Sequence, residues 1–244
     1  MEPRIFRAGP LSADTEVTLT GNPAAHIRKV LRLREGGRLI LFNDSGLDHP
    51  AHITSLDRQR VIVRVGKGYD PGTESPLHMT LIQGICRSQR MDTLIQKSTE
   101  LGVNVIRPVI CERNVVRLDD VRAEKKTEHW RQVAISACEQ CGRARIPTIA
   151  VPGRFDNLMS TRDDNTTIRL LLDPRADTMI GAALGGPASV ALLIGPEGGL
   201  TDAERSTAID AGFRPVKLGP RVLRTETAPV AALSVIQYLA GDLA

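Results

Sequence analysis

The chain has 244 residues, 41% of them apolar and 3% aromatic, with a net charge of +4, and it is long enough for one large domain or for one large and one small domain. No stretch approaches the ~20 apolar residues that a membrane helix needs, and residues 1–9 lack the apolar run of a signal peptide, so we expect a soluble, cytoplasmic protein with no membrane partner. Four cysteines are too few for a disulfide scaffold, and the mild positive charge permits a nucleic-acid partner without requiring one.

The first part of the chain, residues 4–65, is rich in strand patterns. Strands are predicted at residues 16–20, 37–42 and 59–65. Asn22-Pro23 is typical of a helix cap followed by proline at the first helical position, so a short helix should run to about Leu31. Residues 43–46 form a turn cluster between two of the strands. This part is therefore predicted to be a small β-rich module, residues 1–70.

Residues 66–76 are rich in glycine, proline and serine, which predicts a linker and a domain boundary. Beyond it, strands are expected at residues 78–85, 103–110, 167–172, 189–194 and 216–218, and helices at residues 91–101, 124–140, 201–211 and 227–240. Thr201 is followed three residues later by Glu204, which is a capping box. Alternating strands and helices, several of the strands apolar throughout, predict an α/β domain over residues 71–244, with a parallel sheet covered on both faces.

Three loops follow consecutive strands near the C-terminus: residues 173–175, 195–199 and 219–224. In open α/β sheets, ligands bind at the carboxyl ends of the strands. Glycine in such a loop lets backbone groups approach a ligand closely. The loop at 195–199, Gly-Pro-Glu-Gly-Gly, therefore fits a ligand cradle, although its spacing fits an ordinary tight turn before Thr201 about as well.

The common catalytic motifs are missing from the sequence. It has no dinucleotide fingerprint, no P-loop, no G-x-S-x-G elbow and no histidine pair with metal-ligand spacing. Cys138 and Cys141 form a lone C-x-x-C inside a predicted helix, and no second pair of ligands matches it, so two reduced thiols are favoured over a metal or redox site. We therefore predict no metal.

Charged residues gather at two helix ends and in one basic run. Glu139 and Arg143 end the 124–140 helix, and Arg224 and Glu226 open the last helix. A solvated helix end or the helix dipole explains each of them taken alone. The basic run consists of Arg28, Lys29, Arg32, Arg34 and Arg38, against the single acid Glu35. It fits either a phosphate-binding surface or a solvated face.

Several long motifs, in order along nearly the whole chain, resemble one family. The matching segments are QKSTELGVNVIRPV (96–109), ERNVV (112–116), EQCGRARIP (139–147), LLIGPEGGLTDAE (192–204) and LGPRVLRTETAPVAAL (218–233). They are similar to the RsmE family of 16S ribosomal RNA uridine-N3 methyltransferases, in the SPOUT superfamily. At the N-terminus, RIFR and HIRKVLRLREGGRLILFNDSG resemble the family's PUA-like RNA-binding module. Cys141 departs from the family, in which serine is expected at this position.

The resemblance implies a SPOUT-type α/β domain with a deep trefoil knot, a homodimer, and S-adenosylmethionine as the methyl donor. Its expected activity is methylation of uridine N3 in the 16S ribosomal RNA of the small subunit. Carried onto this sequence, the cofactor would be held, largely by backbone groups, by Leu172, Pro174, Ile194, Gly195, Pro196, Glu197, Gly198, Leu218, Gly219, Val222, Leu223, Arg224 and Thr225.

For the chemistry, uridine N3 must lose a proton, so a base and an anion-stabilising group are needed. Glu139 and Glu226 are the candidate bases, and Arg143 and Arg224 the candidate stabilisers. The residues expected to grip RNA phosphates are Arg7, Arg28, Lys29 and Arg32. Two alternatives stay open: a non-catalytic RNA-binding or ribosome-assembly protein that kept the fold, and a methyltransferase that acts on a different base.

Overall fold

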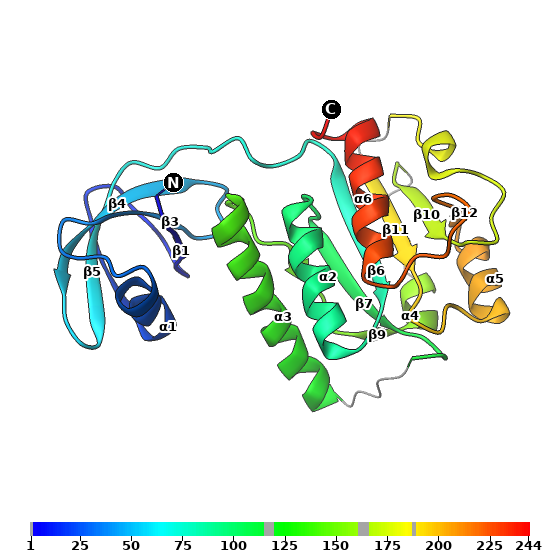
Figure 1. Ribbon diagram of the computed structural model, residues 1–244, viewed down its shortest axis with the longest axis horizontal. Coiled ribbons are helices and arrows are strands. Elements are labelled where there is room, and N and C mark those ends of the chain that lie inside the picture. The colour runs from blue at the N-terminus through cyan, green and yellow to red at the C-terminus, as the bar shows by residue number, and fades with distance from the viewer. Residues whose placement is uncertain (1, 115–119, 161–165, 187–188) are drawn as a thin grey trace. The chain divides into compact units, whose positions relative to one another are not determined.

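The computed structural model describes residues 2–114, 120–160, 166–186 and 189–244 (Figure 1). Val115 and Val116 of the motif at 112–116 lie outside the described residues. The chain divides into two compact units. The first comprises Met1–Glu74 together with Ile135–Ile146, and the second comprises Ser75–Ala134 and Pro147–Ala244. The long helix α3 (Asp120–Cys141) therefore contributes its last residues to the first unit.

The first unit is built on a five-stranded sheet with the order β1-β3-β4-β5-β2. Its strands are β1 (Arg4–Phe6), β2 (Glu16–Thr20), β3 (Arg38–Phe42), β4 (Asp48–Leu56) and β5 (Arg60–Val65). The β1–β3 pair is parallel and the other pairs are antiparallel. Residues of β2 alternate between exposed and buried, so one face of the sheet supplies an aliphatic core that also takes in Ile27.

The short helix of this unit begins earlier than the sequence predicts. Helix α1 (Gly21–Ala25) continues into a π-helical turn, η1 (His26–Val30). Its N-cap is Thr20, whose backbone is extended, so the prediction of a cap at Asn22 is wrong. Pro23 is the third residue of α1 and not the first. Proline is tolerated there because the first N–H groups of a helix have no partner within it.

The second unit is built on a parallel sheet with the order β12-β10-β11-β6-β7-β8, and β9 also pairs with β7. Its strands are β6 (His78–Gly84), β7 (Val105–Ile110), β8 (Thr148–Ile149), β9 (Gly153–Arg154), β10 (Ile168–Leu172), β11 (Ser189–Ile194) and β12 (Arg214–Val216). The helices are α2 (Ser88–Glu100), α3, α4 (Phe155–Ser160), the 3₁₀ turn η2 (Ile180–Ala183), α5 (Asp202–Asp210) and α6 (Thr227–Ala240).

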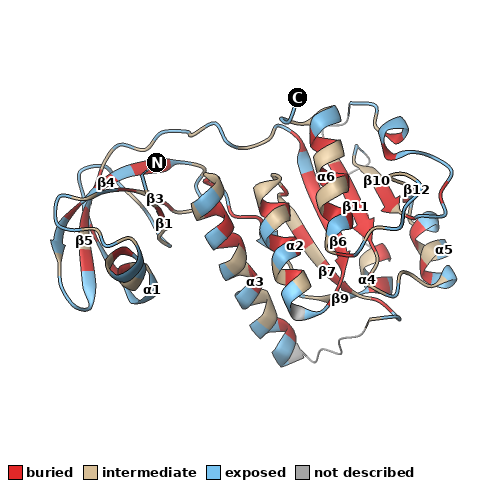
Figure 2. Cartoon of the chain, in the orientation of Figure 1, coloured by how far each residue is buried: buried red, intermediate tan, exposed pale blue. Residues whose placement is uncertain are grey.

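Helices cover both faces of this sheet. Strand β11 lies in its middle and is buried nearly throughout. On one face, Leu171, Leu193 and other strand residues pack with Phe155 of α4 and Ala208 of α5, while α2 and α6 pack together on the other face (Figure 1). Figure 2 shows the strands of the sheet mostly buried, while the outer sides of the helices are exposed or, along most of α6, intermediate. The predicted fold class, a parallel α/β domain with a β-rich N-terminal module, is confirmed.

Helix α5 starts where the capping box predicts, because Thr201 accepts the Glu204 N–H and Glu204 accepts the Thr201 N–H. The last predicted strand lies earlier than expected, at Arg214–Val216.

No helix among the described residues is long and apolar enough to cross a membrane. The trefoil knot stays a prediction.

Candidate functional site

A cavity of about 460 Å³ lies in the second unit, at the carboxyl ends of β10 and β11 and beside the loop that follows β12. This is the edge of a parallel sheet at which ligands bind. The predicted cofactor-binding residues that line it are Leu172, Pro174, Ile194, Gly195, Pro196, Glu197, Gly198, Leu218, Gly219, Val222, Leu223 and Thr225. Arg224 lies between two lining residues, but it is exposed and does not line the cavity itself.

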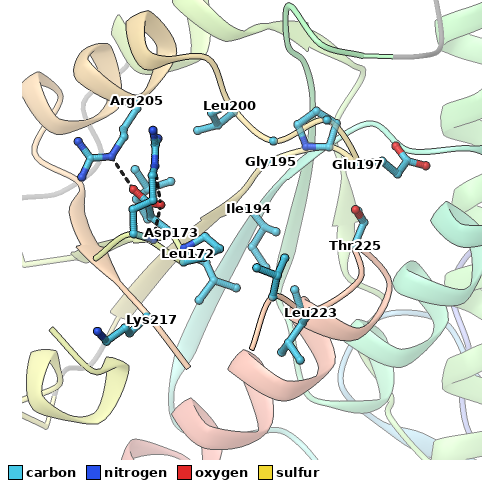
Figure 3. Close-up of a pocket in the computed structure, with 18 of the residues that line it drawn as sticks. Leu172, Asp173, Ile194, Gly195, Glu197, Leu200, Arg205, Lys217, Leu223 and Thr225 are labelled. Carbon is cyan, nitrogen blue, oxygen red and sulfur yellow. Dashed lines mark hydrogen bonds and ion pairs between the residues drawn. The ribbon is translucent and has the colours of Figure 1, made fainter. Parts of the chain in front are cut away.

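The middle of the cavity is apolar, and its wall is partly backbone. Leu172, Ile194 and Leu223 line this part (Figure 3). A Cβ atom on Gly195 would lie 3.1 Å from the Leu200 nitrogen and 3.2 Å from the Gly199 carbonyl carbon, so this loop folds back on itself around a residue without a side chain. The glycine therefore leaves peptide groups, and not a side chain, facing the cavity.

One end of the cavity is an ionic cluster around Asp173, which is buried (Figure 3). Its carboxylate accepts hydrogen bonds from Arg205 and Arg175, and Arg175 also donates to Asp202 at 2.7 Å. Burial raises the pKa of Asp173, but the hydrogen bonds from Arg205 and Arg175 outweigh it and hold the pKa below its ordinary value. Asp173 therefore stays ionised and keeps both guanidinium groups at the cavity wall.

A second charged cluster lies at the other end of the cavity, where Figure 3 shows Glu197 and Thr225. Arg90 of α2 donates to Glu197 Oε1 at 3.3 Å, and its Nε lies 3.7 Å from Oε2 of Glu226. The Arg87 backbone N–H also donates to Glu197 Oε1, at 3.1 Å. Within the described part of the chain, Oε2 of Glu197 and Oε2 of Glu226 are buried and accept no hydrogen bond. These two carboxylate oxygens remain open to a donor.

The other two candidate catalytic residues, Glu139 and Arg143, lie in the first unit, which does not contain the cavity. Arg143 is 3% exposed and pairs through Nε and Nη2 with Glu74. Glu139 Oε1 accepts the backbone N–H of Phe6 at 3.0 Å. Burial raises the pKa of Glu139, against the lowering effect of that hydrogen bond and of nearby cations. Both residues thus hold the end of α3 and the residues that follow it within the first unit.

The predicted RNA-binding residues differ in how freely they can reach a phosphate. Lys29 and Arg32 are exposed. Arg28 is half-buried and donates to the Arg58 carbonyl, and Arg7 donates to the Pro10 carbonyl at 2.9 Å. Arg32 has a left-handed backbone, with φ +52°. The two exposed cations are therefore the residues of this set best placed to meet a polyanion.

The sequence did not single out Arg90, Asp202 or Arg205. Arg90 lies on α2, far along the chain from the three loops and outside the family motifs, whereas Asp202 and Arg205 lie on α5, a few residues after the 195–199 loop. The Cys138 thiol of the C-x-x-C pair is buried, and burial raises its pKa to about 12, so it is held as a thiol.

The comparisons with known proteins place this chain in a family. Residues 73–237 match the RNA methyltransferase domain family, and residues 19–66 match the RNA methyltransferase PUA domain family. A ribosomal RNA small subunit methyltransferase E from Buchnera aphidicola is 35% identical over 241 residues, which cover 99% of this chain and 98% of the relative. The chain belongs to the ribosomal RNA small subunit methyltransferase E family. This confirms the family that the motifs predict, and with it the class of enzyme, an RNA methyltransferase.

Two solved structures resemble the whole chain. A methyltransferase from Legionella pneumophila, in complex with the bound cofactor SAM, is 38% identical with a TM-score of 0.95. A ribosomal RNA small subunit methyltransferase E from Neisseria gonorrhoeae, bound to S-adenosyl methionine, is 37% identical with a TM-score of 0.93. Each comparison covers 100% of both chains. Members of the methyltransferase E family thus share both units and their fold with this chain.

Proposed function

We propose that this protein transfers a methyl group from S-adenosylmethionine to N3 of a uridine in the 16S ribosomal RNA of the small subunit. The observation that carries the proposal is the cavity at the strand ends, lined by the 173–175 loop and by the two loops that the family motifs mark. The two similar structures that hold this cofactor support the donor, and the name of the methyltransferase E family supports the RNA substrate.

The residues present fit this cofactor. A volume of about 460 Å³ is within the usual range for small-molecule sites. The aliphatic middle suits the adenosine, the peptide groups exposed by Gly195 can hydrogen-bond its ring edge, and the charged ends suit the amino and carboxylate groups of the methionine part. When bound, S-adenosylmethionine supplies a methyl group on a positively charged sulfur.

The protein must position the base and take its N3 proton. Glu226 follows the cavity residue Thr225, and its Oε2 is buried without a hydrogen bond from the described residues. We assign it as the base. Its carboxylate accepts the N3 proton, the electron pair of the N–H bond forms the new N–CH₃ bond, and the sulfonium leaves as a neutral thioether, so charge balances. Glu139 is the weaker candidate because its carboxylate already accepts the Phe6 N–H in the first unit.

The remaining parts of the proposal concern assembly and RNA binding. Residues 1–70 act as the PUA-like RNA-binding domain and residues 71–244 as the knotted methyltransferase domain, in a cytoplasmic homodimer. The exposed cations Lys29 and Arg32 of the first unit support the RNA contact. The exposed apolar residues Tyr238 and Leu239 of helix α6 support self-association.

The test is nucleoside mass spectrometry of small-subunit RNA after reaction, with calorimetry of S-adenosylmethionine binding. The wild-type protein should bind the cofactor and produce 3-methyluridine. Glu226→Gln should bind the cofactor normally and lose roughly 10²–10⁴-fold in rate, while Glu139→Gln keeps most of the activity. Absence of cofactor binding would favour a non-catalytic RNA-binding protein, and a different methylated nucleoside would favour another target base.

A further inference from the structure

Arg90 pairs with the cavity residue Glu197, and neither the family motifs nor the three loops mark it. It lies on α2 and reaches two carboxylates, Glu197 of the 195–199 loop and Glu226 at the start of α6. Its side chain is 38% exposed, so a second molecule can reach it. Of its five N–H groups, one donates to Glu197, and the 3.7 Å separation from Glu226 is too long for a hydrogen bond.

We propose that Arg90, paired with Glu226, recognises the hydrogen-bonding edge of the target base and stabilises the negative charge that forms on it. The inference rests on the proposed function, because it assigns the residues that choose the base and assist its deprotonation. Arg90 supplies a donor, and Glu226 supplies an acceptor beside it. A donor next to an acceptor complements a base edge on which an acceptor lies next to a donor.

Uracil has that edge, because O4 and O2 are acceptors on either side of the N3–H donor. Cytosine has the reverse order at the same positions: N3 is an acceptor without a proton, and its neighbour is an amino donor. Facing the Arg90–Glu226 pair, cytosine would set its N3 lone pair against the carboxylate and its amino group against the guanidinium. The pair therefore accepts uridine and rejects cytidine by electrostatic repulsion.

The same pair follows the charge during the reaction. Before the proton moves, Arg90 faces two carboxylates. When Glu226 accepts the N3 proton it becomes neutral, and its negative charge passes to the ring and to the carbonyl oxygens of the base. The guanidinium, still held by Glu197, then donates to the carbonyl oxygen where the charge has developed. Glu197 is thus a positioning residue, since it holds Arg90 from the cavity side.

The experiment compares Arg90→Met with Lys97→Met. Lys97 lies two turns further along the same helix and pairs with Glu100, so its variant removes an equal charge away from the cavity. Single-turnover methylation is measured on small-subunit RNA transcribed with uridine or with 5-fluorouridine. Fluorine withdraws electrons and makes N3–H more acidic, so a substrate that carries it needs less help from Arg90.

On uridine RNA, Arg90→Met should bind S-adenosylmethionine like the wild type and react about 100-fold more slowly. The rate of each protein on 5-fluorouridine RNA is divided by its rate on uridine RNA. This ratio should be roughly tenfold larger for Arg90→Met than for the wild type. Lys97→Met should follow the wild type on both RNAs. If thermal melting shows that Arg90→Met is poorly folded, Arg90→Lys is used in its place. Lysine keeps the positive charge but not the planar guanidinium. The rate of Arg90→Lys should fall less than that of Arg90→Met, and 5-fluorouridine should restore it in the same way.

Two results would overturn the inference alone. In one, wild type makes 3-methyluridine and Arg90→Met is as fast as Lys97→Met. In the other, Arg90→Met loses the same factor on both RNAs, which is the behaviour of a residue that only holds its neighbours in place. A wild-type protein that makes no 3-methyluridine would overturn the proposed function, and this inference with it.

Discussion

Some charged residues of this protein already pair with another residue of the chain, while others keep an atom that a ligand can bind. Arg143 is the clearest occupied case, since both oxygens of Glu74 pair with it. Glu226 is the clearest open case, since its Oε2 is buried and accepts no hydrogen bond from the described residues. Both residues attract attention in the sequence for the same reason, a charge at a helix end. Only the contacts made by each side chain separate a structural role from a chemical one.

The stability of the first unit should depend on pH through Glu139. Burial raises its pKa, which means that the folded state prefers the protonated carboxyl. That contribution to stability is complete below the unfolded pKa of about 4.3 and is lost as the pH rises through the raised, folded-state pKa. At neutral pH the charge on Glu139 is therefore a cost to the fold.

Glu139→Gln should remove this cost and still accept the Phe6 N–H through its amide oxygen. We expect a gain below about 1 kcal/mol, which raises the melting temperature at pH 7.5 by at most about 2–4 °C and disappears towards pH 4. Circular-dichroism melts across this pH range measure it. Glu128→Gln, an exposed change on the same helix, is the control and should show no such trend. A variant that is less stable than wild type at pH 7.5 contradicts the prediction.

At the scale of elements, sequence patterns were most reliable where one local rule decided the structure. The predicted bounds of β2 and α6 agree with the observed ones, and Thr201 caps α5 with the expected hydrogen bonds. Strand β4 was not predicted, because His49-Pro50 interrupts its pattern; in the fold, Pro50 is exposed and pairs with Ile40 of β3. Strand β1 is three residues long and is set by its parallel partner β3, a contact that no local rule encodes.

In the candidate site, too, the sequence predicted the features that a local pattern marks and missed those that depend on tertiary contacts. The loops that line the cavity were predictable, because each follows a strand, and those at 195–199 and 219–224 also carry a family motif. Arg90 and Arg205 were not, since their roles depend on α2 and α5 packing beside those loops. Arg205 lies close to the 195–199 loop along the chain, but its contact with Asp173, like the contact of Arg90 with Glu197, forms only when the chain packs.

Helix α6 should mediate self-association. Its buried side faces its own unit, while Tyr238 is 62% and Leu239 is 48% exposed at its C-terminal end. Apolar residues exposed side by side favour burial against a partner. Light scattering at micromolar concentration should give a mass near twice 26.5 kDa, and Tyr238→Glu with Leu239→Lys should shift it towards the monomer. Val121→Lys, an exposed apolar position on α3, is the control; a monomeric wild type would refute the prediction.

For the whole molecule, RNA affinity and cofactor binding should depend on different units. The basic run lies in the first unit, and the cavity is lined by residues of the second. Phosphate contacts weaken as salt rises because bound counterions are released. Lys29→Gln combined with Arg32→Asn removes two exposed cations of the basic run, and asparagine tolerates the left-handed backbone at position 32. Cofactor affinity should not change.

The measurement is RNA affinity across a salt series, plotted as the logarithm of affinity against the logarithm of salt concentration. Each lost phosphate contact lowers the slope by about 0.7–0.9, so the double variant should lower it by about 1.4–1.8. Arg60→Gln combined with Lys97→Gln removes the same net charge from cations that pair with Asp57 and Glu100, and should change the slope much less. Equal slopes for the wild type and the Lys29–Arg32 variant would mean that Lys29 and Arg32 are solvated, and that RNA is bound by other residues of the chain.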